Sequence, residues 1–157
     1  MEESETHLRQ AIALALSNVA AGGRPFGAVL VRDGKVVATG VNTVRSTNDP
    51  TGHAELNAIR AASATLGTAD LSGCTVYASG HPCPMCMAAM RLAGIGAVTF
   101  AYSNEDGEPY GLSTAAIYAD LARPFSEQSM RIRHIPVRLA DREEPYREWS
   151  RRQAAQR

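Results

Sequence analysis

Cysteine, net charge and long apolar runs are all scarce in this sequence of 157 residues. The three cysteines are an odd number and two of them form a Cys-x-x-Cys pair, which argues against a disulfide framework and for a reducing compartment. No apolar run approaches the length of a membrane span, and residues 1–5 are acidic where a secretory signal would be positively charged. We therefore expect a cytoplasmic protein with no membrane partner.

The formal net charge of zero gives no general support for binding to nucleic acid or to an anionic membrane. Lysine is nearly absent as well. From Arg123 onward the arginines outnumber the acidic residues, so this tail could contact phosphate, but we favour a solvated helix face. Nucleic acid is accordingly an unlikely partner, and a small molecule is the expected one.

The length suits one compact domain over residues 1–157, large enough to bury roughly 70% of its unfolded surface. Apolar residues at helical spacing predict a first helix over 5–20, and Asp33-Gly34 predicts a tight hairpin between strands 26–32 and 35–41. The remaining segments are, in order, loop 42–52, helix 53–66, strand 75–79, helix 84–94, strand 97–102, acidic loop 103–110, helix 114–121, edge strand 131–139 and helix 143–156. This order predicts a three-layer α/β/α sandwich around a mixed five-stranded sheet.

One imidazole and two thiolates stand out as metal ligands: His53, Cys83 and Cys86. Three protein ligands hold Zn²⁺ and leave a fourth tetrahedral position for water, whereas a structural zinc would be closed by a fourth Cys or His. The nearest alternative ligand is His81, which lies two residues before Cys83 with a proline between them. Glu55 adds a carboxylate that can shuttle protons beside such a water. The pattern indicates a catalytic zinc site.

Both halves of this motif fall at predicted helix N-termini, where the helix dipole favours thiolates and a bound hydroxide. His53 and Glu55 would diverge on a regular helix, but at its end both can reach a metal lying beyond it. The alternative is an ordinary helix cap at His53 and Glu55 with two buried cysteines. Cys74 opens an apolar run and is most simply a buried strand residue.

Four stretches together resemble the cytidine deaminase superfamily, and within it the guanine deaminase and tRNA-adenosine deaminase branch. They are Pro25-Phe26-Gly27-Ala28-Val29, Asn42, His53-Ala54-Glu55 and Pro82-Cys83-Pro84-Met85-Cys86. The resemblance implies the sandwich fold, a homodimer and one zinc per subunit. It assigns the metal to the His and the two Cys of the motif and proton shuttling to Glu55. It also places the backbone N–H of Ala54, the amide of Asn42 and the ring of Phe26 at the substrate.

The implied reaction is attack of water on a ring carbon that bears an exocyclic amine. Glu55 would move a proton from the water to a ring nitrogen and then help to protonate the departing ammonia. Asn42 could donate to and accept from an amide-like edge, and Phe26 could pack on the ring face. The alternatives are core packing for Phe26 and a turn role for Asn42.

The substrate is less clearly indicated. Phe26 resembles the guanine branch, because the tRNA enzymes usually have Val at this position. The stretch 110–118 also resembles the guanine branch. Where guanine deaminases typically carry an acidic residue, however, Ser113 or Thr114 stands here, and of the two we take Ser113 as the substrate-contact candidate. Asp106 and Glu108 could replace that carboxylate, although a solvated loop is the favoured interpretation. The tail after Gln153 also lacks the aromatic residue that closes the neighbouring subunit's site in the guanine branch.

His81 stands where relatives place a carboxylate, just before a metal ligand. It could project into the pocket and select a different polar edge of the substrate, or it could be a surface histidine without substrate contact. The sequence predicts a zinc-dependent aminohydrolase of a small heterocyclic base, with guanine the best single candidate. Cytosine, a triazine or another purine analogue, or a nucleoside, is the alternative, followed by tRNA adenosine and by a non-catalytic zinc-binding module.

Overall fold

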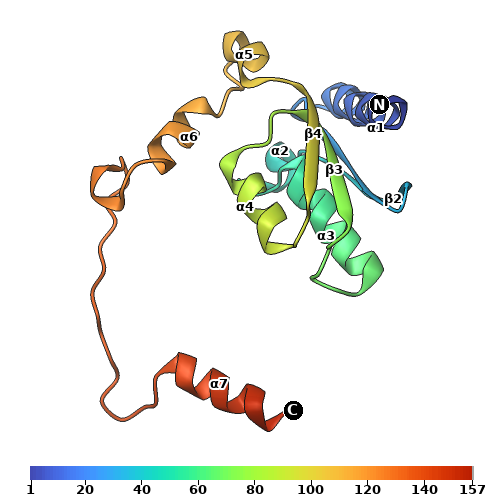
Figure 1. The fold of residues 1–157 in the computed structure, drawn as a ribbon. Coiled ribbons are helices and arrows are strands. Elements are labelled where there is room, and N and C mark those ends of the chain that lie inside the picture. The colour runs from blue at the N-terminus through green and yellow to red at the C-terminus, as the bar shows by residue number, and fades with distance from the viewer. Residues whose placement is uncertain (157) are drawn as a thin grey trace. The chain divides into compact units, whose positions relative to one another are not determined.

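A computed structural model describes residues 1–156, which form two compact units, 1–122 and 123–156 (Figure 1). The second unit contains a 3-10 turn, η2 (Phe125–Glu127), and one helix, α7 (Pro145–Ala155). The expectation of a single domain over residues 1–157 stays a prediction. None of the helices in residues 1–156 combines the length and the apolar character needed to cross a membrane.

The first unit contains a sheet and the helices around it. Its strands are β1 (Gly27–Arg32), β2 (Lys35–Val41), β3 (Cys74–Gly80) and β4 (Ala97–Tyr102). Its helices are α1 (Glu2–Ala20), α2 (Val44–Thr47), α3 (Ala54–Leu66), α4 (Pro84–Leu92), α5 (Asn104–Gly107), the 3-10 turn η1 (Glu108–Tyr110) and α6 (Ala115–Leu121). Three of these, α2, α5 and η1, lie in stretches for which the sequence predicts loops.

The sheet has the strand order β2-β1-β3-β4. Strand β1 pairs antiparallel with both β2 and β3, whereas β3 and β4 are parallel, so the sheet is mixed as predicted. The predicted hairpin is confirmed: Asp33 and Gly34 both have positive φ, 50° and 74°, as a two-residue turn of the favoured twist requires.

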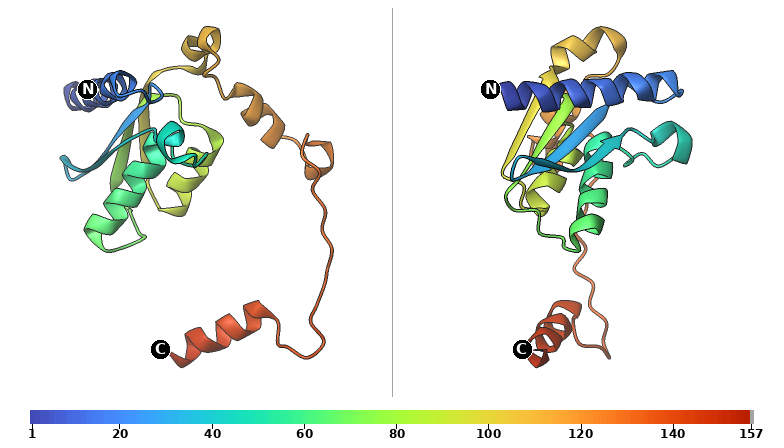
Figure 2. Two further views of the ribbon diagram at one scale, coloured as in Figure 1. Left: turned by 180° about the vertical axis from the view of Figure 1, so that it is seen from behind. Right: turned by 90° about the vertical axis from the view of Figure 1, so that its right-hand side faces the viewer.

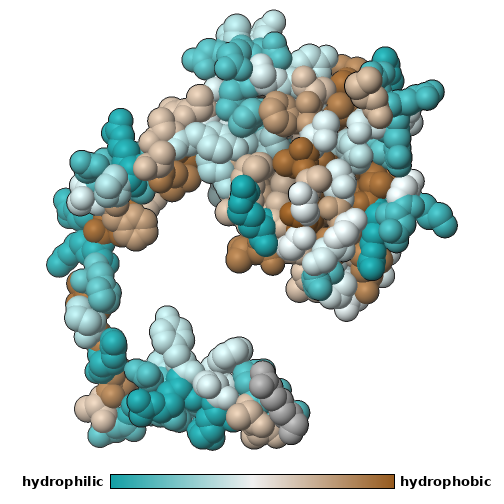
Figure 3. Space-filling view, viewed as in Figure 1, coloured by the Kyte–Doolittle hydropathy of each residue, from teal (hydrophilic) through white to brown (hydrophobic). Residues whose placement is uncertain are grey.

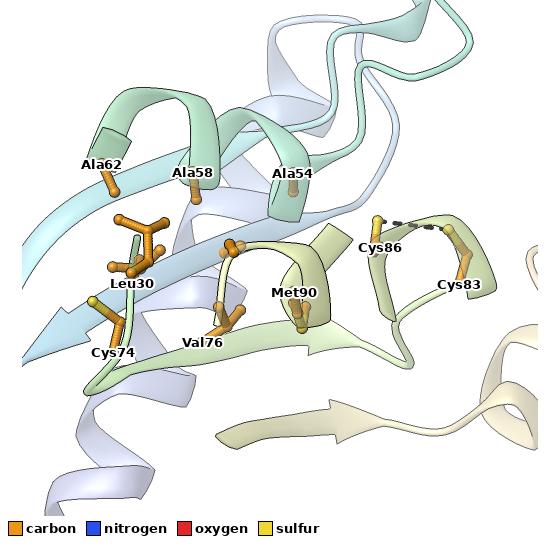
Figure 4. Close-up of a cluster of buried hydrophobic side chains, with 12 residues drawn as sticks. Leu30, Ala54, Ala58, Ala62, Cys74, Val76, Cys83, Cys86 and Met90 are labelled. Atoms are coloured by element: carbon orange, nitrogen blue, oxygen red, sulfur yellow. Dashed lines mark hydrogen bonds between the residues drawn. The ribbon is translucent and has the colours of Figure 1, made fainter. Parts of the chain in front are cut away.

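Helices cover both faces of this sheet, which gives the predicted three layers (Figure 2). Side chains of β1 alternate between the faces: Val29 and Val31 pack with Ala11 of α1, whereas Leu30 packs with α3 and α4 on the other side (Figure 4). Complete burial of Leu30 alone contributes about 2 kcal/mol of transfer free energy. The alternating pattern therefore fixes which face each helix covers.

Glycine allows the closest helix approach. A Cβ at Gly40 would collide with the backbone carbonyl of Ala54, the first residue of α3. Because the obstacle is backbone, it cannot move aside as a flexible side chain could. The absence of a side chain at Gly40 thus sets how near the start of α3 lies to β2.

The prediction of five strands is wrong, because the described sheet has four. Residues 131–139 alternate polar and apolar side chains, yet they form no strand, and every one of them is exposed. Alternation gives a segment strand propensity, but a strand also needs a partner with which to exchange backbone hydrogen bonds. Strand β4 is consequently an edge of the described sheet.

Replacing Gly40 by alanine is expected to lower the free energy of unfolding by about 2 kcal/mol or more, because α3 must shift away from β2. Urea denaturation followed by circular dichroism measures this change. Gly96→Ala is the matched control, since a Cβ there would meet nothing within 4 Å. Equal stability of the two variants would contradict the close-approach argument.

Candidate active site

The metal-ligand candidates come together where two helices begin. His53 is the N-cap of α3, Cys83 is the N-cap of α4, and Pro84 occupies the first turn of α4, where a missing N–H costs nothing. Figure 4 shows Cys83 and Cys86 facing one another at this end of α4. The sequence prediction that both motifs lie at helix N-termini is confirmed.

The three ligand atoms have the spacing of a tetrahedral site. Sγ of Cys83 lies 3.3 Å from Nδ1 of His53 and 3.5 Å from Sγ of Cys86, and the third pair is 3.6 Å apart. With Zn–S near 2.3 Å and Zn–N near 2.0 Å, the edges of a tetrahedron are about 3.5 to 3.8 Å long. The geometry and the donor set therefore fit zinc. Among the described residues this cluster has only three members, which leaves one position for water.

The electrostatics of the cluster prepare it for a cation. A hydrogen bond with Cys86 lowers the pKa of Cys83 to about 4. The same hydrogen bond, and then burial, raise the pKa of Cys86. The hydrogen bond with Cys83 also raises the pKa of His53. Without metal, the three ligands thus share protons that a bound zinc would displace.

Glu55 lies one residue into α3 and is only 5% exposed. Burial, the largest influence, raises the pKa of its carboxyl group above the usual range, and a hydrogen bond with Cys86 opposes that rise. A carboxyl group with a raised pKa exchanges protons nearer to neutral pH than an exposed glutamate does. It is placed to act as a base and then as an acid beside the metal ligands.

A small cavity of about 60 Å³ adjoins these groups. Of the substrate-contact candidates from the sequence, Phe26, Asn42, Ala54 and His81 all line it, together with Glu55. Ser113 does not: it borders a separate surface depression, and its hydroxyl accepts a hydrogen bond from the N–H of Ala115. Thr114, the other residue considered at that point of the sequence, lines the cavity instead.

The orientation of the Asn42 amide follows from its backbone contacts. Its Oδ1 accepts a hydrogen bond from the N–H of Val44 at 3.1 Å, so its Nδ2 remains as the group available to a ligand. The turn role and the cavity role considered for this residue therefore coexist. Asn42 can offer a donor to the cavity, while one lone pair of its Oδ1 already accepts from the backbone.

Sequence reasoning missed two cavity residues, Arg24 and Leu112. The cation of Arg24 also lies 6.0 Å from the centre of the Phe26 ring. Its position directly before the Pro-Phe-Gly stretch was a signal that could have drawn attention to it. Leu112 lies in the stretch 110–118 that resembles the guanine branch, but nothing in the resemblance singled out this residue, because it reaches the cavity through the path of the chain after β4.

The acidic loop supplies no replacement carboxylate at the cavity. Asp106 forms a reciprocal capping box with Ser103 at the start of α5, and it borders a larger groove of about 560 Å³. Glu108 borders the same separate depression as Ser113. Neither lines the cavity beside Glu55. The larger groove does share Phe26, His81 and Leu112 with that cavity.

The fold and the site define a zinc-binding deaminase. A family model, the cytidine and deoxycytidylate deaminase zinc-binding region, matches residues 1–102, and the chain belongs to this family. The guanine deaminase of Bacillus subtilis (strain 168) is 41% identical over 146 residues, which are 92% of each protein. The X-ray structure of guanine deaminase from Bacillus subtilis superimposes with a TM-score of 0.85 at 40% identity, covering 94% of this chain and 93% of that one.

Relatives with lower coverage include both guanine deaminases and tRNA adenosine deaminases. The guanine deaminase structure from Nitrosomonas europaea has a TM-score of 0.67 at 31% identity, covering 70% of this chain and 64% of that one. A tRNA-specific adenosine deaminase from Agrobacterium fabrum is 48% identical over 71 residues, or 45% of this chain and 47% of that protein. With these relatives, the site identifies the chain as a hydrolytic C–N deaminase.

The buried carboxyl group predicts a pH-dependent stability difference in the metal-free protein. The folded-state pKa of Glu55 lies above its unfolded value, so as pH rises between the two values only the unfolded state loses the proton, and stability falls. The loss is about 1.4 kcal/mol for each unit of difference and persists at higher pH. Glu55→Gln removes this titration.

We therefore expect metal-free Glu55→Gln to be more stable than the metal-free wild type at pH 8, with the gap closing toward pH 4. Urea denaturation at a series of pH values measures it. Glu105→Gln, on an exposed side chain of α5, is the control and should leave the pH profile unchanged. A gap that is constant with pH would contradict the burial of an ionisable Glu55.

Proposed function

We propose that this enzyme hydrolytically deaminates a free heterocyclic base and that guanine is the first candidate. The observation that carries the proposal is the match to a guanine deaminase over 92% of both proteins, whereas the tRNA adenosine deaminase from Agrobacterium fabrum matches over less than half. Phe26, which distinguishes the guanine branch in the sequence, lines the cavity beside Glu55. Both findings favour a base over a tRNA nucleotide.

His53, Cys83 and Cys86 would hold one zinc per subunit. When bound there, zinc supplies a low-pKa water at neutral pH. Glu55 takes a proton from the attacking water, because its buried carboxylate lies beside the ligands and has a raised pKa. It then passes the proton to the ring nitrogen next to the attacked carbon. In the last step Glu55 takes the second proton, from the hydroxyl group now bonded to that carbon, and gives it to the amine; the C–N bond breaks, ammonia departs and a carbonyl is left.

Three groups would hold the base in position for this attack. The ring of Phe26 provides an apolar face, and Ala54 begins α3, where a backbone N–H has no partner within the helix. Asn42 adds the N–H groups of its amide. These donors suit a base that presents a carbonyl oxygen or ring nitrogens with lone pairs.

The absence of a second carboxylate keeps other bases in consideration. Thr114 lines the cavity in the stretch where guanine deaminases typically carry an acid. Cytosine, a triazine, another purine or a nucleoside is therefore the second candidate substrate, acted on through the same groups. All of these require the same Glu55 chemistry.

Ammonia release from zinc-loaded enzyme tests the proposal across guanine, cytosine, adenine, isoguanine, ammeline and the matching nucleosides. We expect guanine to be turned over, and Glu55→Gln to lower the rate by about a hundredfold or more while zinc content is unchanged. Zinc is measured by mass spectrometry of the purified protein. An unchanged rate in Glu55→Gln would rule out proton transfer by Glu55. Turnover of another base with none of guanine would overturn the guanine assignment.

We also propose that the enzyme is a cytoplasmic homodimer. Three free cysteines, two of them required as thiolates by the metal, favour a reducing compartment. For assembly, none of residues 123–156 is buried, although this unit carries several large, exposed apolar side chains. Figure 3 shows hydrophobic residues of this unit scattered among hydrophilic ones. A unit this short cannot bury a core by itself. A second copy of the chain would cover this surface.

Sedimentation of the intact protein should give twice the chain mass of 16.8 kDa, or about 34 kDa. Replacing Val137 and Leu139, both 70% exposed, by serine should weaken the assembly by removing apolar surface. Arg138→Ser, at the position between them, is the matched control. A single-chain mass for the wild type at micromolar concentration would refute the dimer.

A further inference from the structure

Asn104 connects two residues of the substrate cavity although it does not line that cavity itself. It is the first residue of α5, immediately after Ser103, whose hydroxyl and backbone N–H both bond to Asp106 in a capping box. This box fixes the start of α5 without any contribution from the Asn104 side chain. The amide of Asn104 is therefore free to make other contacts.

Those contacts reach His81 and Thr114. The Oδ1 atom of Asn104 accepts a hydrogen bond from the backbone N–H of Thr114 at 3.2 Å, and its Nδ2 lies 3.3 Å from Nδ1 of His81. A backbone N–H can only donate, so the oxygen of the amide must face Thr114. The nitrogen of the amide must then face His81, and it too can only donate.

The polarity of the His81 ring follows. To accept from Asn104, Nδ1 must carry a lone pair, which places the ring proton on Nε2. The carbonyl of Pro82 also lies 3.1 Å from Nδ1, but the hydroxyl of Tyr118 already satisfies it, whereas a proton on Nδ1 would face the Asn104 amide N–H, donor against donor. The Asn104 amide nitrogen has no other acceptor among the contacts of residues 1–156. It therefore decides the tautomer.

Packing fixes the plane of the same ring. Phe100 meets it edge-on at 4.7 Å between ring centres, and Tyr118 does so at 5.3 Å. Edge-to-face contacts of this kind favour one orientation of a ring over its rotation. With its plane and its tautomer both set, His81 carries its N–H on Nε2, and the residue lines the cavity.

Thr114 completes the arrangement. Its hydroxyl is buried and has no hydrogen-bond partner in the described part of the chain, yet the residue lines the cavity with His81 and Glu55. A buried hydroxyl without a partner is costly, and a ligand can satisfy it. Asn104 holds the backbone of this residue, so the same amide positions both groups.

We propose that Asn104 is a positioning residue that orients His81 and Thr114 as hydrogen-bond donors, and that the enzyme thereby selects bases bearing a ring carbonyl. The proposal rests on the proposed deaminase function and specifies its substrate class. A carbonyl oxygen accepts from both donors, whereas a ring that lacks this oxygen leaves them buried and unpaired. Discrimination then comes from an N–H and an O–H donor in place of a second carboxylate.

The tautomer of His81 tests the positioning role without any substrate. Zinc-loaded enzyme with ¹⁵N-labelled histidine reports it through the two ring nitrogen shifts, with His81→Gln identifying the signals. Wild type should show the proton on Nε2. Asn104→Asp keeps an acceptor for the Thr114 N–H but offers His81 an acceptor as well, so the proton should move to Nδ1. Unchanged shifts in Asn104→Asp would overturn the positioning role.

Two purines with the same amine test the selection. Guanine and 2-aminopurine differ in the ring carbonyl, and wild type should prefer guanine in kcat/KM. Asn104→Leu and Thr114→Val should each lower that preference by about three- to tenfold, which is the value of one or two neutral hydrogen bonds. The decrease should come from a lower kcat/KM for guanine, with kcat/KM for 2-aminopurine unchanged. Glu105→Gln, the neighbour on α5 that borders neither the cavity nor the larger groove, should leave it unchanged.

The outcomes separate the two proposals. Equal wild-type rates on guanine and 2-aminopurine would overturn carbonyl selection while the deaminase function stands. If a preference exists but neither Asn104→Leu nor Thr114→Val alters it, these residues do not cause it and the inference is wrong. Ammonia release from no base would refute the proposed function, and the histidine shifts would then decide the role of Asn104 by themselves.

Discussion

The close approach of α3 to β2 is the constraint on which the site depends. Gly40 lets the first residue of α3 lie against the sheet, and Ala54 and Ala58 continue the contact with side chains small enough to keep it. This places His53 at the end of the helix, within 3.3 Å of Cys83. A metal site with edges near 3.5 Å tolerates little displacement, so backbone packing that contains no ligand determines whether the ligands meet.

The same packing creates an electrostatic conflict that the chemistry requires. Burying Glu55 raises the pKa of its carboxyl group and disfavours the charged form, while the start of α3 and a bound cation favour it. A carboxyl group near this balance can accept and return a proton within one reaction cycle. An exposed glutamate would destabilise the folded protein less. The pKa of its carboxyl group, however, would be too low for it to give the proton to the departing amine. The site thus retains a residue that does not favour folding.

Local patterns in the sequence were enough to predict the parts of the protein that rest on local chemistry. Asp33-Gly34 identified the hairpin, and the spacing of His53, Cys83 and Cys86 identified the metal cluster. The fifth strand failed because alternation over 131–139 describes a propensity, whereas pairing depends on a distant partner. The choice of Ser113 over Thr114 was wrong for a similar reason. The sequence does not show which of these two neighbouring side chains faces the cavity.

Asn42 and Asn104 show why substrate polarity was beyond sequence reasoning. A side-chain amide contains a donor and an acceptor, and its residue name does not say which one a ligand will meet. In both cases a backbone N–H binds Oδ1, from Val44 in one and from Thr114 in the other, so the amide nitrogen is turned toward the remaining neighbour. Asn42 directs that donor to the cavity, and Asn104 passes its polarity through the His81 ring. Main-chain donors, fixed by the fold, therefore determine that the site recognises acceptors, and a carboxylate is not needed to define the substrate.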